Sequence, residues 1–280
     1  MSNSKFPASQ ANVSTEEHSV VREHLDAFTE RHGVRILLAC ESGSRAWGFA
    51  SPDSDYDVRV VYVHDLDWYL SIDLERRADA IDPDIVETPA GEVDLHAWDV
   101  RKALRLFHAS NPTLLEWLQS PIVYREDAGW MDRWRGLIPE VYRPAAAGYH
   151  HLHMARKNAK RYLDDEEEEV PMKEYLYVIR SLLAIRWVEA TSDPVPVRFA
   201  RLVDAGVQDR RLRDAVARLT ARKQQRGEAG RIERMPALDA FIRNELDRHA
   251  DARFESEERR PDRDVLNRLF REIVTAVPAG

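Results

Sequence analysis

Hydrophobic and polar residues follow two different patterns along the chain, and the pattern changes near residue 125. Before that point, short apolar runs rich in β-branched and aromatic residues predict strands near 34–40, 56–63 and 93–98. Between them, a capping box at Ser14–Glu17 opens a first predicted helix, and helical spacing predicts further helices near 66–79, 99–109 and 111–117. Mixed strands and helices of this kind predict an α/β (α+β) fold with a mixed central sheet.

The chain after Pro121 loses almost all strand signals. Apolar residues recur there at helical spacing, which predicts helices near 143–163, 172–190, 197–205, 208–225, 236–255 and 261–276. We therefore expect a catalytic domain over 16–125 and an all-helical domain over 126–280, preceded by a disordered polar segment over 1–15.

Residues that could bind a ligand or take part in catalysis lie where the first predicted strand ends. The apolar run Ile36–Cys40 is broken by Glu41-Ser42-Gly43-Ser44. Gly43 lets the backbone approach a ligand closely, and Ser44 offers donors from its amide and its hydroxyl. If a helix begins here, its free amide groups favour an anion such as a phosphate.

Three aspartates follow this turn on two predicted strands. A turn at Pro52–Ser54 precedes an alternating run that starts at Asp55. Because positions two apart in a strand share a face, Asp55, Asp57 and Arg59 point the same way. Asp94 lies in the next short strand, on the face opposite its apolar neighbours. The pattern therefore predicts a carboxylate cluster near the Gly-Ser turn.

Carboxylates aligned in this way repel each other unless a cation lies between them. At about 4 Å and an effective dielectric near 20, the repulsion is roughly 4 kcal/mol. Oxygen ligands favour magnesium or manganese over zinc. For Asp55 and Asp57 alone, an acidic sheet edge facing solvent explains the pattern equally well. The Gly43-Ser44 turn and Asp94 favour a metal site instead.

These residues also carry a family resemblance. Glu41–Phe49 together with Ser54–Arg59 resembles the YcgL/RlaP group, the RNA repair pathway branch of the DNA polymerase beta nucleotidyltransferase superfamily. The resemblance continues through 111–118 and more loosely through 173–187, and it fades towards the C-terminus. It implies a metal-dependent transfer of a nucleoside monophosphate from an NTP such as ATP, with release of pyrophosphate.

The resemblance also implies roles for individual residues. Gly43 and Ser44 would hold the triphosphate. Asp55 and Asp57 would bridge two Mg²⁺ or Mn²⁺ ions, and Asp94 would complete the site of the ion nearer the acceptor hydroxyl. In such a site the ions stabilise the attacking and leaving oxygens of an in-line displacement.

Residues around the acidic site are assigned supporting roles in nucleotide binding or in holding the loop. Arg45 and Arg59 are assigned to nucleotide binding, and a structural salt bridge remains an open alternative for both. By loose analogy with helical domains of the superfamily, Lys173 and Tyr175 are assigned to the NTP as well. Glu41 is expected to hold the loop by hydrogen bonds.

Two aromatic residues and one histidine near the site receive structural interpretations. We expect Trp47 and Phe49 to pack the turn onto the sheet rather than to stack on a base. His96 shares the predicted face of Asp94, where it is expected to act as a structural hydrogen-bonding group.

Composition limits the class of protein. The 280 residues are 44% hydrophobic and 32% charged, which is typical of a globular protein with a highly charged surface. No apolar stretch approaches the ~20 residues that span a bilayer, so we expect no membrane partner. A single cysteine excludes an internal disulfide and fits a reducing cytoplasm.

The net charge of −8 argues against a general nucleic-acid coat protein, yet charge is unevenly distributed. The acidic run 164–169 is expected to be a solvated loop between helices. The segment 198–234 has eleven Arg or Lys against five Asp or Glu. It is either a track for a polynucleotide backbone or an arginine-rich surface without a ligand.

The sequence thus predicts a magnesium-dependent nucleotidyltransferase whose acceptor is an RNA or another polynucleotide end. Transfer to a protein hydroxyl or a small molecule is the alternative enzyme reaction. A non-catalytic nucleotide-binding or antitoxin-like protein is the alternative from another class, although a binder has no chemical need for three carboxylates.

Overall fold

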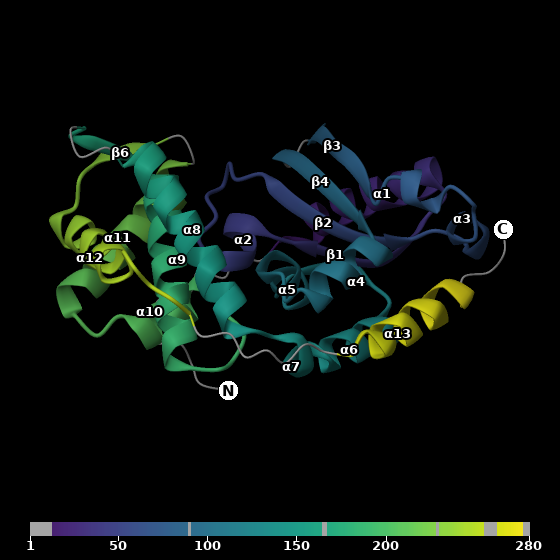
Figure 1. Ribbon diagram of the computed structural model, residues 1–280. Helices are drawn as coiled ribbons and strands as arrows, with labels where there is room; N and C mark the ends of the chain where they lie inside the picture. The colour runs from purple at the N-terminus through teal and green to yellow at the C-terminus, as the bar shows by residue number, and fades with distance from the viewer. Residues whose placement is uncertain (1–12, 89–90, 164–166, 228–229, 255–261, 277–280) are drawn as a thin grey trace. The chain divides into compact units, whose positions relative to one another are not determined.

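The strands of the first half of the chain form one mixed sheet in this computed structural model (Figure 1), which describes residues 13–88, 91–163, 167–227, 230–254 and 262–276. Its strands are β1 (Arg35–Glu41), β2 (Tyr56–Val63), β3 (Ala80–Thr88), β4 (Gly91–Asp99) and β5 (Val123–Glu126). Their order is β3-β4-β2-β1-β5, with β2 and β4 parallel and the other neighbours antiparallel. This confirms the predicted α/β fold with a mixed central sheet.

Helices cover both faces of the sheet (Figure 1). On one face α1 (Thr15–His32) buries Val21, Leu25 and Phe28 against the alternating strand residues Val58 and Val60. The helix begins at the predicted capping box, in which Ser14 and Glu17 bond each other's backbone. The other face is covered by α4 (Val100–His108), α5 (Pro112–Leu118), α6 (Ala128–Gly136), α7 (Ile138–Val141) and α13 (Arg263–Thr275).

This second set of helices leaves the beginning of β2 and β4 open. Its core includes Val61 and Val63 from the later part of β2. Asp57 and Arg59 lie on the same face of the strand but earlier, and both are only partly buried. The polar site therefore lies where the helical cover of this face ends.

The second half of the chain forms a helical unit around α9 (Met172–Ala190). Residues on all sides of α9 are buried, because α8 (Pro144–Tyr162), α10 (Phe199–Gly206), α11 (Arg210–Arg226) and α12 (Pro236–Arg248) surround it. A two-stranded hairpin, β6 (Glu169–Pro171) with β7 (Arg231–Glu233), completes this unit. The region after residue 125 is mainly helical as predicted, but this hairpin makes it not all-helical, and α6, α7 and α13 belong to the sheet unit.

Contacts along the chain divide it into two compact units whose limits are not simply N- and C-terminal. Within the described residues, the sheet unit comprises 13–46, 55–88, 91–142 and 262–276, and the helical unit comprises 47–54, 143–163, 167–227 and 230–254. In the helical unit Phe49 is fully buried, with its ring 5.3 Å from that of Phe199. The division into domains at residue 125 stays a prediction about independent folding.

Several local predictions were wrong. The helix expected over 66–79 is only α3 (Leu66–Tyr69), followed by a 3₁₀ turn at Leu74–Arg76. The strands β3 and β5 were not predicted, and Trp47 and Phe49 pack in the helical unit rather than onto the sheet. Residues 1–12 of the segment expected to be disordered, and 164–166 of the acidic run, lie outside the described residues. Within the described residues no helix is long and apolar enough to cross a bilayer.

Candidate active site

Two of the three predicted aspartates lie side by side on neighbouring strands. The parallel pairing of β2 with β4 places Asp57 directly opposite Asp94. In both strands the alternate residues are buried, so these two side chains project from the partly open face. The register that the apolar residues of each strand impose therefore brings the two carboxylates together.

Arg59 links this pair of carboxylates. Its Nη2 donates to Asp57 Oδ1 at 2.7 Å and to Asp94 Oδ2 at 3.1 Å. Its Nη1 also donates to the main-chain carbonyl of Asp94 at 2.8 Å, which fixes the guanidinium across the two strands. Sequence reasoning left a salt bridge and a phosphate contact open for Arg59, and in this structure it forms the salt bridge.

Asp55 lies at the exposed end of the same acidic edge. It directly precedes β2, and its main-chain carbonyl accepts a bond from Arg45 Nε at 3.2 Å. Glu92 lies near the start of β4, close enough to be affected by the charge of Asp55. Loss of hydration, and then this charge, raise the pKa of Glu92. Asp55 thus adds negative charge to this edge, while Arg59 pairs with the other two aspartates.

Gly43 lies directly against Asp57. Its φ is +58°, and a Cβ placed on it would lie 2.0 Å from Asp57 Oδ2. The turn begins the short helix α2 (Gly43–Trp47), and the Ser42 amide donates to the Asp57 carbonyl at 2.9 Å. Because only glycine leaves room here, the predicted turn and the predicted carboxylate form one contiguous site.

Glu41 was expected to hold the loop that follows it, and its side chain instead bonds the backbone of Asp57 and the hydroxyl of Tyr124. The Asp57 amide donates to Glu41 Oε1 at 2.9 Å, and the Tyr124 hydroxyl is hydrogen-bonded to Glu41 Oε2. Glu41 is fully buried, and burial raises the pKa of its carboxyl to about 8. Tyr124 was missed by sequence reasoning, because nothing in its short strand marks it as a partner of Glu41.

Arg45 and Ser44 are buried beside the turn. The Arg45 guanidinium carbon lies 3.9 Å from the centroid of the Tyr56 ring, and the Tyr56 hydroxyl donates to Glu17. Together with its bond to the carbonyl before β2, this contact makes Arg45 part of the support of the strand. Its predicted role in nucleotide binding stays a prediction, as does that of Ser44.

Lys173 and Tyr175 belong to the helical unit. Tyr175 is fully buried, and its hydroxyl donates to Asp239, so in this structure that hydroxyl is not available to a ligand. Lys173 is partly exposed, with Nζ 5.9 Å from the centroid of the Tyr177 ring. Of the two residues, Lys173 is the one that keeps its side chain at the surface.

The residues at the acidic edge fit a divalent cation in donor type and partly in arrangement. Within the described residues, no three acidic, histidine or cysteine side chains already form a metal-ligating group. Asp57 and Asp94 nevertheless share one cation, the Arg59 guanidinium. The buried Asp94 Oδ1 lies 3.0 Å from His96 Nε2, a contact without hydrogen-bond geometry, so the imidazole also lies at the acidic edge. Carboxylate oxygens are the ligands that magnesium and manganese prefer.

Known proteins of three kinds are similar to this chain. A family model described as "RlaP: RNA repair pathway DNA polymerase beta family" matches residues 18–272. The uncharacterized protein YcgL of Bacillus subtilis (strain 168) is 40% identical over 257 residues, which cover 91% of this chain and 95% of YcgL. A solved nucleotidyltransferase-like protein from Exiguobacterium sibiricum 255-15 aligns with a TM-score of 0.32 and 10% identity, over 83% of this chain and 78% of that one.

Proposed function

The chain belongs to the RNA repair pathway DNA polymerase beta family (RlaP), and from this membership and its acidic sheet edge we propose that it is a metal-dependent nucleotidyltransferase. The reaction moves a nucleoside monophosphate from an NTP to an acceptor hydroxyl and releases pyrophosphate. The observation that carries the proposal is the pairing of Asp57 with Asp94 around one cation, with the Gly43 turn packed against Asp57.

The proposed ligands of the divalent ions are Asp55, Asp57 and Asp94, with Mg²⁺ or Mn²⁺ as the cation and two ions in all. When bound, such ions lower the pKa of an acceptor hydroxyl and stabilise negative charge on the attacking and leaving oxygens. Asp57 and Asp94 are held ready for this role by strand register, and Glu41 fixes the backbone of Asp57. Most of the acceleration would come from alignment and preorganised charge.

Arg59 has a specific part in this proposal. In the absence of a divalent ion its guanidinium neutralises Asp57 and Asp94, which would otherwise repel each other. If the two carboxylates held a divalent ion instead, the Arg59 guanidinium would be able to bind a phosphate oxygen. Gly43 and Ser44 are the proposed contacts of the triphosphate, because the turn that they form packs directly against the Asp57 carboxylate.

The test of the proposal is a transfer assay with each of the four labelled NTPs, magnesium, and RNA, DNA or no added acceptor. We propose an RNA or other polynucleotide end as the acceptor, so label should appear on RNA. Label on the protein itself would point to protein nucleotidylation, and NTP binding without transfer would point to a non-catalytic binder. Asp55→Asn and Asp94→Asn should each abolish transfer while the thermal unfolding midpoint stays unchanged or rises, and full activity in either variant would contradict the metal assignment.

A further inference from the structure

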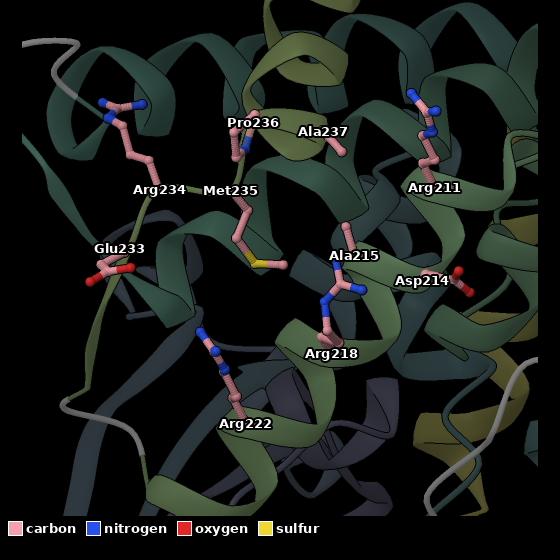
Figure 2. Close-up of a pocket in the computed structure, with 10 residues that line it drawn as sticks. All are labelled: Arg211, Asp214, Ala215, Arg218, Arg222, Glu233, Arg234, Met235, Pro236 and Ala237. Carbon is pink, nitrogen blue, oxygen red and sulfur yellow. The ribbon is translucent and has the colours of Figure 1, made fainter.

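A hollow in the helical unit is lined by arginines that the proposed reaction does not use. It has a volume of about 450 Å³ and lies between α11, β7 and the start of α12. Figure 2 shows the side chains that line it: Arg211, Asp214, Ala215, Arg218, Arg222, Glu233, Arg234, Met235, Pro236 and Ala237. Both the charge and the spacing of these residues identify a class of ligand.

Three of these arginines have no partner among the residues that the structure describes. Arg211, Arg218 and Arg222 are exposed, and none of them has a hydrogen bond or an ion pair with any residue that the structure describes. Most other arginines of the helical unit are engaged: Arg234 pairs with Asp239 at 2.9 Å, and Arg213 pairs with Asp204 at 2.9 Å. A charged group left without a partner at a concave surface is available to a ligand of opposite charge.

The two acidic residues of the hollow do not cancel this charge. Asp214 is exposed and lies 3.9 Å from Arg210, which is outside the hollow. Glu233 is exposed on β7, and in Figure 2 it lies at the edge of the hollow away from Arg211. With four arginines against two carboxylates, the lining keeps an excess of positive charge. This local excess stands out in a chain whose net charge is −8.

The spacing of the unpaired arginines fits a linear polyanion. Arg211, Arg218 and Arg222 are seven and four residues apart on α11, so they recur on one face of the helix. At 1.5 Å per residue they extend over about 16 Å, a length of about five nucleotides at 3.4 Å each along one strand. A single phosphate or a free nucleotide would engage only part of this row.

The apolar part of the lining makes base-specific recognition unfavourable. Ala215, Met235, Pro236 and Ala237 offer contact surface but neither aromatic rings for stacking nor polar groups for base edges. In Figure 2 the side chains of Arg218 and Arg222 extend from α11 on the side where Met235 lies. Recognition at this surface would therefore act on the backbone of the ligand and tolerate any sequence.

We propose that this surface, defined by Arg211, Arg218 and Arg222, binds the phosphate backbone of a single-stranded nucleic acid. The proposal deepens the function proposed above, because it assigns a place where a polynucleotide acceptor is held by residues remote in sequence from the acidic motif. The surface binds strands by charge and by the length of its arginine row, independently of base sequence.

The experiment measures binding of a fluorescent 12-nucleotide RNA by anisotropy at a series of salt concentrations, with no NTP and no divalent metal. Replacing all three residues (R211Q/R218Q/R222Q) should weaken binding about 100-fold at 0.1 M salt and lower the slope of log K against log salt by about 2, since each phosphate contact contributes about 0.7 for a single strand. The lysine variant R211K/R218K/R222K keeps the charges and should retain most of the slope.

A matched control removes the same charge elsewhere. Arg263, Arg268 and Arg271 are exposed on α13, and like the three arginines of the hollow they have no partner among the described residues. The variant R263Q/R268Q/R271Q should bind RNA with the wild-type salt slope. Equal effects of the two triple variants, or none from the α11 variant, would overturn the proposal.

Further arms identify the ligand. A DNA strand of the same length should bind with a similar salt slope. Tighter binding of a blunt duplex than of either strand would overturn the single-strand assignment. Competition by an acidic peptide as effective as that by RNA would also overturn it. Absence of RNA binding by the wild-type protein at 50 mM salt would overturn it as well. Because neither NTP nor metal is present, this test stands apart from the test of the transfer reaction.

Discussion

Replacing Arg59 by glutamine tests whether Asp57 and Asp94 form a cation site. The substitution removes the guanidinium that both carboxylates share, at 2.7 Å and 3.1 Å from its Nη2. Since both oxygens lie within hydrogen-bond distance of one nitrogen, they are at most about 6 Å apart, and at an effective dielectric of 20 their repulsion is about 3 kcal/mol. Without divalent ions, the free energy of unfolding of Arg59→Gln should fall by about that amount.

A divalent ion should reverse this loss in the variant more than it stabilises wild type. In wild type the ion must displace the guanidinium, whereas in Arg59→Gln the pair of carboxylates has no competing cation. An ion present at 100 times its dissociation constant stabilises the folded state by about 2.7 kcal/mol. The difference between the two proteins therefore lies in the response to metal as well as in the stability without it.

The assay is thermal unfolding by circular dichroism, with EDTA in one series and MnCl₂ or MgCl₂ in the other. At 2–4 °C per kcal/mol, the midpoint of the variant should drop by about 6–12 °C in EDTA and recover most of that in manganese. Arg35→Gln is the matched control, because Arg35 forms a single-carboxylate ion pair with Asp127 at 2.8 Å among the described residues of the same unit. Identical metal-induced shifts in wild type, Arg59→Gln and Arg35→Gln would refute the shared-cation reasoning.

Two further predictions have internal controls. Gly43→Ala should abolish transfer and lower the free energy of unfolding more than Gly33→Ala does. Both glycines have φ of +58°, but only at Gly43 would the new Cβ meet the Asp57 side chain. Chemical denaturation of both variants measures the difference. Burial lowers the pKa of His151 well below 6.5, so the unfolded state takes up a proton that the folded state does not, and wild type loses stability from this group as the pH falls below about 6.5. His151→Gln should reduce the loss of unfolding free energy between pH 7 and pH 5. His153 is exposed on the same helix, so His153→Gln should keep the pH dependence of wild type. A similar pH dependence in both variants would contradict the assignment.

Periodicity predicted the elements that are buried on a regular face. The predicted limits of β2 and α9 agree with the structure. In the early half of β2 buried and partly buried residues alternate, and α9 buries apolar residues on all sides. The edge strand β3 was missed, since Pro83 and three acidic residues interrupt its apolar positions and none of its residues is buried. Its strand conformation is imposed by hydrogen bonding to β4 and is not indicated by its own sequence.

The candidate site could be predicted in its parts but not in its internal pairing. Asp57, Asp94 and Gly43 were identified from residue type and spacing, and the structure brings them together. The role of Arg59 depends on the parallel register of β2 with β4, which no local pattern specifies. Likewise the support of Glu41 by Tyr124 joins residues 83 positions apart in the sequence. Long-range contacts of this kind are set by tertiary packing.

A divalent ion bound by both Asp57 and Asp94 is the central requirement of the proposed reaction. The most direct measurement is a crystal structure of the protein with manganese and a non-hydrolysable NTP, with the ions located by anomalous scattering. We predict manganese within about 2.3 Å of an oxygen from each of these aspartates, with the Arg59 guanidinium displaced from at least one of them. Manganese bound elsewhere, with the Arg59 bridge intact and the triphosphate away from Gly43, would contradict the account.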